Sequence, residues 1–194
     1  QAPSSTSAPS ISPSTSTPIE EPSPVVNGEI VLGETSNNVV YYRCSSGSGS
    51  QQIVLLHGGS FSKETWRSTG ILQDFCADAM ITIALDWPSS NNHVRLMETL
   101  DSLQDDARIP LFTLPIILVT PSASGYSMVD WMVNGNVAMM SNYISTWVPV
   151  ATGSLPSASD DQVASIMEYE PMTFVLAIHG NDDMAGARYS ARLE

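Results

Sequence analysis

The sequence is poor in basic residues, and this scarcity excludes whole classes of partner. Its 194 residues hold seven Lys and Arg against 20 Asp and Glu, and Lys63 is its only lysine. Nucleic acids and anionic lipid surfaces are bound through clustered Lys and Arg side chains. A chain with a formal net charge of −13 therefore predicts no nucleic-acid partner. Acidity of this kind favours solubility and names no substrate.

Long apolar runs, cysteines and glycosylation sequons are also scarce. No apolar stretch approaches the ~18 residues of a membrane-spanning helix, so we expect no membrane span in this chain. The two cysteines, Cys44 and Cys76, allow one disulfide at most, and their spacing fits no metal motif. Free thiols and a single bridge both stay open. No N-x-[ST] sequon occurs, and we expect neither a metal nor a cofactor.

Residues 1–26 differ in composition from the rest of the chain. The first 25 residues contain 11 Ser or Thr and six of the 13 prolines, which predicts a disordered stalk or linker of the type that is often O-glycosylated. The chain begins on Gln1 rather than Met; a removed signal peptide or signal anchor would explain this, and so would a fragmentary sequence. With the two cysteines, these features favour an extracellular or secretory-lumenal protein, with a cytoplasmic one as the alternative.

From Asn27 onward, strand-like and helix-like segments alternate. The patterns predict strands over 28–34, 38–44, 52–56, 80–85, from 116, 147–151 and 172–178, and helices over 64–79, 94–107, from about 125, and over 160–167. Such alternation predicts an α/β fold with a mainly parallel sheet and helices on both faces. Ligands of such sheets bind beyond the carboxyl ends of the strands. The loops that follow the strands are therefore the places to search for chemistry.

Ser122 lies in one of these loops, at the end of the apolar run 115–119. In α/β hydrolases, a buried strand delivers a nucleophilic serine into a sharp strand-to-helix turn, with the pattern G-x-S-x-G. Here Thr120 and Ser124 occupy the glycine positions, so the pattern is degenerate. An ordinary strand that enters a polar loop explains the same run.

Two other loops hold residues that would complement a nucleophile. After the strand 52–56, the Gly59 N–H, together with the N–H of Ala123, would stabilise the oxyanion that forms during acyl transfer. After the strand 172–178, Asp183 stands where a triad acid is usual, and we favour it over Asp182. Each loop also has a simpler interpretation: a Gly-rich turn before a helix in the first case, and a turn or helix cap in the second.

Several strings together resemble one family. They are HGGSFSKETW at 57–66, the Asp86-Trp87-Pro88 loop, TPSASGYS at 120–127, VPVA at 148–151 and HGNDDMAG at 179–186. In this order they resemble the alpha/beta-hydrolase-domain-containing protein 14 group, from about Asn27 to Tyr189. In that group the nucleophile directly follows the proline, which corresponds to Ser122 rather than Ser124, and the acid corresponds to Asp183.

The resemblance implies an α/β-hydrolase domain over 27–194 that hydrolyses acyl esters, or acyl amides in members that remove acetyl groups from lysine. The substrate would be a small acyl compound or an acylated protein. A serine nucleophile also needs a general base, because its hydroxyl is scarcely ionised at neutral pH. In this fold the base is a histidine ~20 to 40 residues beyond the acid, after one more strand.

The sequence stops at Glu194 without such a histidine, so we expect a domain that is incomplete at its C-terminus and lacks the last strand and helix. His57 belongs to the oxyanion loop, His93 follows the strand 80–85, and His179 stands at a strand end; all three are poor substitutes. Two main interpretations stay open: a truncated serine hydrolase, or an inactive form that binds or regulates a protein partner. A stalked adhesion or scaffold protein is a third.

Overall fold

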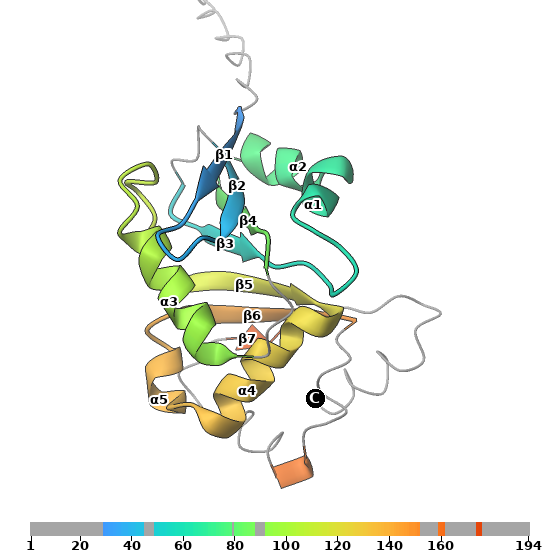
Figure 1. Cartoon of the computed structure of the whole chain (residues 1–194), viewed down its shortest axis with the longest axis vertical. Helices are drawn as coiled ribbons and strands as arrows, with labels where there is room; N and C mark the ends of the chain where they lie inside the picture. Colours follow the sequence, from blue (N-terminus) through green and yellow to red (C-terminus); the bar gives the residue numbers. More distant parts are fainter. Residues whose placement is uncertain are drawn as a thin grey trace, which may run out of the picture.

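Within the described residues, a seven-stranded sheet forms the centre of the molecule (Figure 1). The computed structural model describes residues 29–44, 49–78, 80–87, 92–151, 159–161 and 174–175. Its strands are β1 (Ile30–Glu34), β2 (Val40–Cys44), β3 (Gln52–Leu55), β4 (Ile81–Leu85), β5 (Ile116–Pro121), β6 (Ile144–Val150) and β7 (Phe174–Val175). They lie in the order β1-β2-β4-β3-β5-β6-β7.

The sheet is parallel except at one edge. β1 and β2 form an antiparallel hairpin, and β2 also pairs antiparallel with β4. From β4 through β3, β5 and β6 to β7, each neighbouring pair is parallel. The mainly parallel sheet that the sequence predicts is therefore confirmed. Because these strands point the same way, the loops that follow β3, β4, β5 and β6 all leave the same edge of the sheet.

Helices cover both faces of the sheet. They are α1 (Glu64–Ser68), α2 (Ile71–Ala77), α3 (His93–Gln104), α4 (Tyr126–Asn134) and α5 (Val137–Met140), with a short 3-10 turn, η1 (Ser122–Gly125), before α4. Figure 1 shows α1 and α2 on one side of the sheet and α3 and α4 on the other. This arrangement confirms the predicted three-layer α/β architecture.

The alternation of side chains along the strands produces two separate cores. On β3, Ile53 and Leu55 pack in the cluster that contains Leu72 of α2. Val54 packs in the larger cluster, with residues of α3 and α4 such as Leu96. Successive residues of a strand point to opposite faces, so a central parallel strand needs apolar residues at every position. This is why β3 and β4 are buried at every position and, apart from Gln52 and Thr82, apolar.

The structure differs from the prediction at several element boundaries. The single helix predicted over 64–79 is wrong, because the chain breaks into α1 and α2 at Gly70, whose φ is +83°. β6 begins at Ile144 rather than Trp147, and α5 was not predicted. Of the predicted segments 160–167 and 172–178, only residues 160–161 and 174–175 are described, and the stalk over 1–26 lies outside the described residues.

Cys44 and Cys76 form a disulfide, with their Cα atoms 5.6 Å apart. The bond joins the end of β2 to α2 and settles the alternative that the sequence left open. Among the described residues, none of the helices has the length and apolar character needed to cross a bilayer.

Candidate active site

Ser122 occupies a sharp turn between a buried strand and a helix. β5 ends at Pro121, η1 begins at Ser122, and α4 follows directly from Tyr126. The φ angle of Ser122 is +50°, a conformation that L residues other than glycine rarely adopt. Ser122 is exposed, whereas Ser124 and Gly125 behind it are buried. The backbone thus adopts a strained conformation that presents one serine at the carboxyl edge of the sheet.

The hydroxyl residues at the two degenerate positions of the motif take part in the local structure. Ser124 is 5% exposed, and its Oγ donates to the Pro121 carbonyl at 2.8 Å. Thr120 is fully buried, and its Oγ1 accepts from Nε1 of Trp147 on β6 at 2.8 Å. Both side chains therefore occupy the usual glycine positions without obstructing the turn. The same contacts distinguish the two serines, because the Ser124 hydroxyl is buried against its own backbone.

The loop after β3 packs directly against this turn. A Cβ atom added to Gly58 would lie 3.3 Å from Cβ of Ser122, and one added to Gly59 would lie 3.3 Å from Cβ of Ala123. The close approach of two backbones is the structural reason for glycine at both positions. The structure therefore brings together three of the residues that the sequence singles out: Gly59, Ser122 and Ala123.

The orientation of the Gly58–Gly59 peptide is fixed by two hydrogen bonds. The Gly58 carbonyl accepts from the Phe61 N–H at 3.0 Å and faces Nδ1 of His57 at 2.8 Å. Because a carbonyl can only accept, Nδ1 is the donor of this second bond. In a trans peptide, the C=O and the following N–H point in opposite directions. The Gly59 N–H is therefore directed away from His57 and Phe61.

The strand order, with its antiparallel β1–β2 hairpin at one edge, places a strained serine after β5 and a Gly-rich loop after β3. This combination of a sharp strand-to-helix turn and a facing Gly-rich loop defines a known architecture. The described chain has the α/β-hydrolase fold.

Besides His57, the structure describes one more histidine of this α/β-hydrolase fold, His93, and its ring contacts α4. His93 is the first residue of α3; its Nδ1 lies 2.6 Å from Oδ2 of Asp130 on α4, and its ring stacks on Trp131. Burial alone would raise the pKa of Asp130, but hydrogen bonds from the His93 backbone, the Asn134 amide and the His93 ring outweigh it and lower that pKa. His179 and both Asp182 and Asp183 lie outside the described residues.

Two charged residues beside the Gly58–Gly59 loop were not among the predicted site residues. Oδ1 of Asp86, directly after β4, lies 3.4 Å from Nε2 of His57, and its Oδ2 lies 3.3 Å from Nζ of Lys63. The sequence carried a signal for each residue: Lys63 is the only lysine, and Asp86 follows a predicted strand. Nothing in the sequence indicated that they meet.

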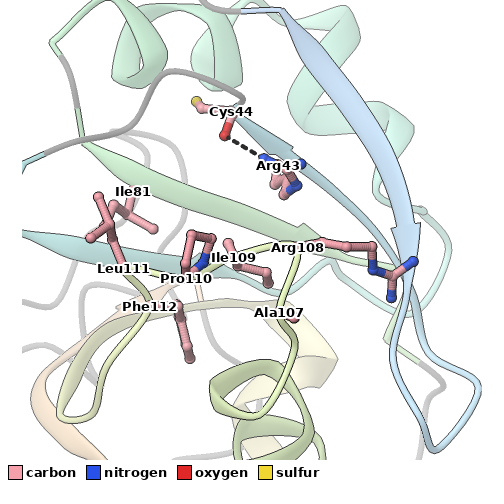
Figure 2. Close-up of a pocket in the computed structure, with 9 residues that line it drawn as sticks. All are labelled: Arg43, Cys44, Ile81, Ala107, Arg108, Ile109, Pro110, Leu111 and Phe112. Atoms are coloured by element: carbon pink, nitrogen blue, oxygen red, sulfur yellow. Dashed lines mark hydrogen bonds between the residues drawn. The ribbon is translucent and has the colours of Figure 1, made fainter.

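A pocket of about 380 Å³ lies elsewhere, between the end of β2, the start of β4 and the chain after α3 (Figure 2). Its apolar wall includes Ile109 and Phe112, and two arginines, Arg43 and Arg108, border it. Ile81 opens β4, whereas Ser122 follows the end of the parallel strand β5. The pocket therefore lies at the amino ends of the parallel strands, whereas the serine turn lies at their carboxyl ends.

Several known proteins are similar to part of this chain. No family model matches the chain. The chain is 27% identical over 146 residues to Protein ABHD14A of Homo sapiens, an alignment that covers 73% of this chain and 50% of that protein. The chain thus spans about half the length of this curated relative.

Solved structures of similar shape share little sequence with the chain. A CIB-like hydrolase from Thermoplasma acidophilum has a TM-score of 0.48 and 14% identity, covering 73% of this chain and 69% of that protein. The carboxylesterase CesB from Bacillus subtilis has a TM-score of 0.46 and 16% identity, covering 66% and 44%. Cfl2 from Burkholderia cenocepacia has a TM-score of 0.47 and 18% identity, covering 72% and 48%.

Proposed function

We propose that the chain belongs to a serine hydrolase that cleaves acyl esters or acyl amides, with Ser122 as the nucleophile. The observation that carries this proposal is the φ of +50° at Ser122, an exposed serine in a strained turn against Gly58 and Gly59. Strain of about 1 kcal/mol or more persists only where the surrounding structure maintains it, and such sites are often functional. The alternative nucleophile, Ser124, is buried and bonded to Pro121.

In the proposed reaction, Oγ of Ser122 attacks the acyl carbonyl carbon while its proton passes to a general base. The carbonyl oxygen becomes negative and is stabilised by the N–H groups of Gly59 and Ala123. Collapse of the tetrahedral intermediate expels the alcohol or amine, which takes up the proton, and leaves the acyl group on Ser122. Water then attacks the acyl-enzyme with the aid of the same base and releases the carboxylic acid.

The acid and the base of the triad are proposed without a described position in the structure. Asp183 is the proposed acid, on the strength of the G-[DN]-x-D turn that it shares with the resembled group. No histidine follows His179 in the sequence, so the general base has no assigned residue here. His93 is a poor candidate because the histidine near this position in the resembled group is not the base.

The substrate class is proposed from the same resemblance: a small acyl ester, or an acylated protein whose lysine loses an acetyl group. We further propose an extracellular or secretory-lumenal location. The Cys44–Cys76 disulfide supports it, because structural disulfides persist in oxidising compartments and are rare in the cytosol. The cytoplasm is the alternative.

A second candidate function is a catalytically inactive binding or regulatory module. Such a module would retain the fold and the Ser122 turn without hydrolytic activity, and its partner would be a protein.

Covalent labelling with a fluorophosphonate probe distinguishes the two candidates. The 194-residue chain is expected to label weakly, and a longer form read from the source transcript beyond Glu194, with a Gly-His loop after one more strand, is expected to label strongly. Ser122→Ala should abolish labelling, and Ser124→Ala, the matched control, should preserve it. If a folded longer form with such a histidine does not react, the module is correct and the hydrolase is not.

A further inference from the structure

We propose that Lys63 is a positioning residue that acts through Asp86 and His57 to fix the Gly58–Gly59 peptide beside Ser122. Gly59 is an oxyanion donor only under the proposed function, so this inference rests on that function. Lys63 itself touches neither the substrate nor Ser122 in this scheme. Lys63 positions the Asp86 carboxylate, which orients the His57 ring. The ring in turn fixes the Gly58–Gly59 peptide through its bond to the Gly58 carbonyl.

The first contact in this chain is the one between His57 and the Gly58 carbonyl. The Nδ1–H of His57 donates to that oxygen at 2.8 Å, and the ring is 9% exposed. The Gly58 carbonyl accepts a second hydrogen bond, from the Phe61 N–H of the same turn. Loss of the His57 bond would leave the Gly58 carbonyl held by the Phe61 N–H alone, and the peptide could tilt about that contact because neither Gly58 nor Gly59 has a side chain to resist rotation.

The second contact joins His57 to Asp86. Nε2 of His57 is buried and makes no well-aligned hydrogen bond within the described part of the chain. Oδ1 of Asp86 lies 3.4 Å from this nitrogen. We therefore take the ring as carrying a proton on each nitrogen, with Nδ1–H donating to the Gly58 carbonyl and the Nε2 proton facing the carboxylate. A carboxylate on the Nε2 side of the ring favours the orientation in which Nδ1 faces the Gly58 carbonyl. The Asp86 backbone is itself fixed, since its N–H donates to the Val40 carbonyl at 2.7 Å.

The third contact is the ion pair between Asp86 and Lys63. Nζ of Lys63 lies 3.3 Å from Oδ2 of Asp86 and 5.3 Å from the centre of the Tyr42 ring. The Lys63 side chain is only 12% exposed, while that of Asp86 is 39% exposed. Lysine is rarely buried unless its ammonium is paired. The sole lysine of an acidic protein is thus held between a carboxylate and an aromatic ring at the edge of the candidate site.

Arg67 provides a matched control for Lys63. Its guanidinium lies 5.4 Å from the centre of the same Tyr42 ring, and it comes from the next turn of the same segment. Its ionic partner, however, is Glu64, at 4.0 Å, and its side chain is 54% exposed. Arg67→Met removes a cation from Tyr42 without touching Asp86, whereas Lys63→Met removes the ion pair as well.

The first test reads the peptide directly and needs no catalysis. In the full 194-residue chain labelled with ¹⁵N-glycine, Lys63→Met and Asp86→Asn should both shift the Gly59 amide resonance. The double variant should shift it no further, because the two changes break one chain of contacts. Lys63→Arg should restore the wild-type position, and Arg67→Met should leave it unchanged. A Gly59 resonance that stays at its wild-type position in folded Lys63→Met overturns the proposal.

The second test links the peptide to reactivity. Under the proposed function, Lys63→Met should slow fluorophosphonate labelling of Ser122 about tenfold, because a donor displaced by a fraction of an ångström stabilises the oxyanion less. The maximal labelling rate should fall, whereas the probe concentration that gives half of the maximal rate should stay unchanged. A fall equal to that of Arg67→Met overturns the proposal. If the folded longer form with the added histidine does not label but Gly59 responds as expected, the positioning role holds and the hydrolase function fails.

Discussion

At the scale of single residues, the strained backbone of Ser122 is open to measurement. Its φ of +50° costs an L residue about 1 kcal/mol, and glycine adopts it freely. Ser122→Gly should therefore be more stable than Ser122→Ala by about 1 kcal/mol in the free energy of unfolding, measured with urea. Both variants lack the hydroxyl, so the comparison isolates the backbone. Equal stabilities would mean that the turn is not strained.

The degenerate motif shows why the sequence could suggest Ser122 but not secure it. The hydroxyl of Thr120 accepts from Trp147, which lies 27 positions further along the chain. The Ser124 hydroxyl folds back onto Pro121. These bonds allow the turn to form without the usual flanking glycines, and no local pattern reveals them. The Gly58–Gly59 pair, by contrast, was readable, because a close approach of backbones needs glycine wherever it occurs.

At the scale of elements, apolar spacing predicted the sheet and its helices but not the interruption between α1 and α2. The spacing runs through Gly70 without a break, and a single glycine within a helical pattern is often tolerated. What ends α1 is the left-handed conformation of Gly70, with φ at +83°. Only the three-dimensional path from α1 onto the face of the sheet requires that conformation.

Gly70 gives an element-scale prediction free of packing effects. A Cβ added there would meet nothing within 4 Å, so Gly70→Ala should be destabilised only by the positive φ, by about 1 kcal/mol. Gly135 is the matched contrast: its φ is −91°, but an added Cβ would lie 2.4 Å from the Trp131 ring. Gly135→Ala should therefore lose more, about 2 kcal/mol, through overpacking. Urea unfolding of both variants checks the order, and the reverse order would contradict it.

A second element-scale prediction concerns Asp106, which ties the chain after α3 to the β1–β2 hairpin. Its carboxylate accepts from the Tyr41 hydroxyl at 2.6 Å and from Nη2 of Arg108 at 2.8 Å. The Arg108 hydrogen bonds, against the opposing effect of burial and with help from Tyr41, lower the pKa of Asp106 from 3.8 to about 2. Desolvation, more than the neighbouring Asp106, raises the pKa of Tyr41 to about 12.

Because the folded pKa lies below the unfolded one, the stabilisation is present above pH ~4 and is lost as the pH falls toward about 2. Asp106→Asn should therefore have a free energy of unfolding about 1 kcal/mol lower than that of the wild type at pH 7. This difference should shrink between pH 4 and pH 2. Urea unfolding at a series of pH values measures it. A difference that stays constant through this window would exclude the ionised carboxylate as its cause.

At the scale of the whole molecule, the order of motifs along the chain was the most informative property of the sequence. The fold follows from alternation of strands and helices, because that alternation dictates a parallel sheet with one active edge. Gly59 and Ser122, 63 positions apart, could be placed together on this basis alone. The contacts of Lys63 with Asp86 could not, because each side chain by itself has the composition of an ordinary surface charge.

The Cys44–Cys76 disulfide is the covalent constraint on the whole molecule. It closes a loop of 32 residues between β2 and α2, which corresponds to about 4 kcal/mol of unfolded-state entropy. Reduction, or Cys44→Ala with Cys76→Ala, should lower the free energy of unfolding by a similar amount and so lower the melting temperature, and reductant should not affect the double variant. Protein secreted through an oxidising compartment should show no reactive thiol until it is unfolded and reduced. Two thiols titrating in that folded material would contradict both the bond and the proposed extracellular or lumenal location.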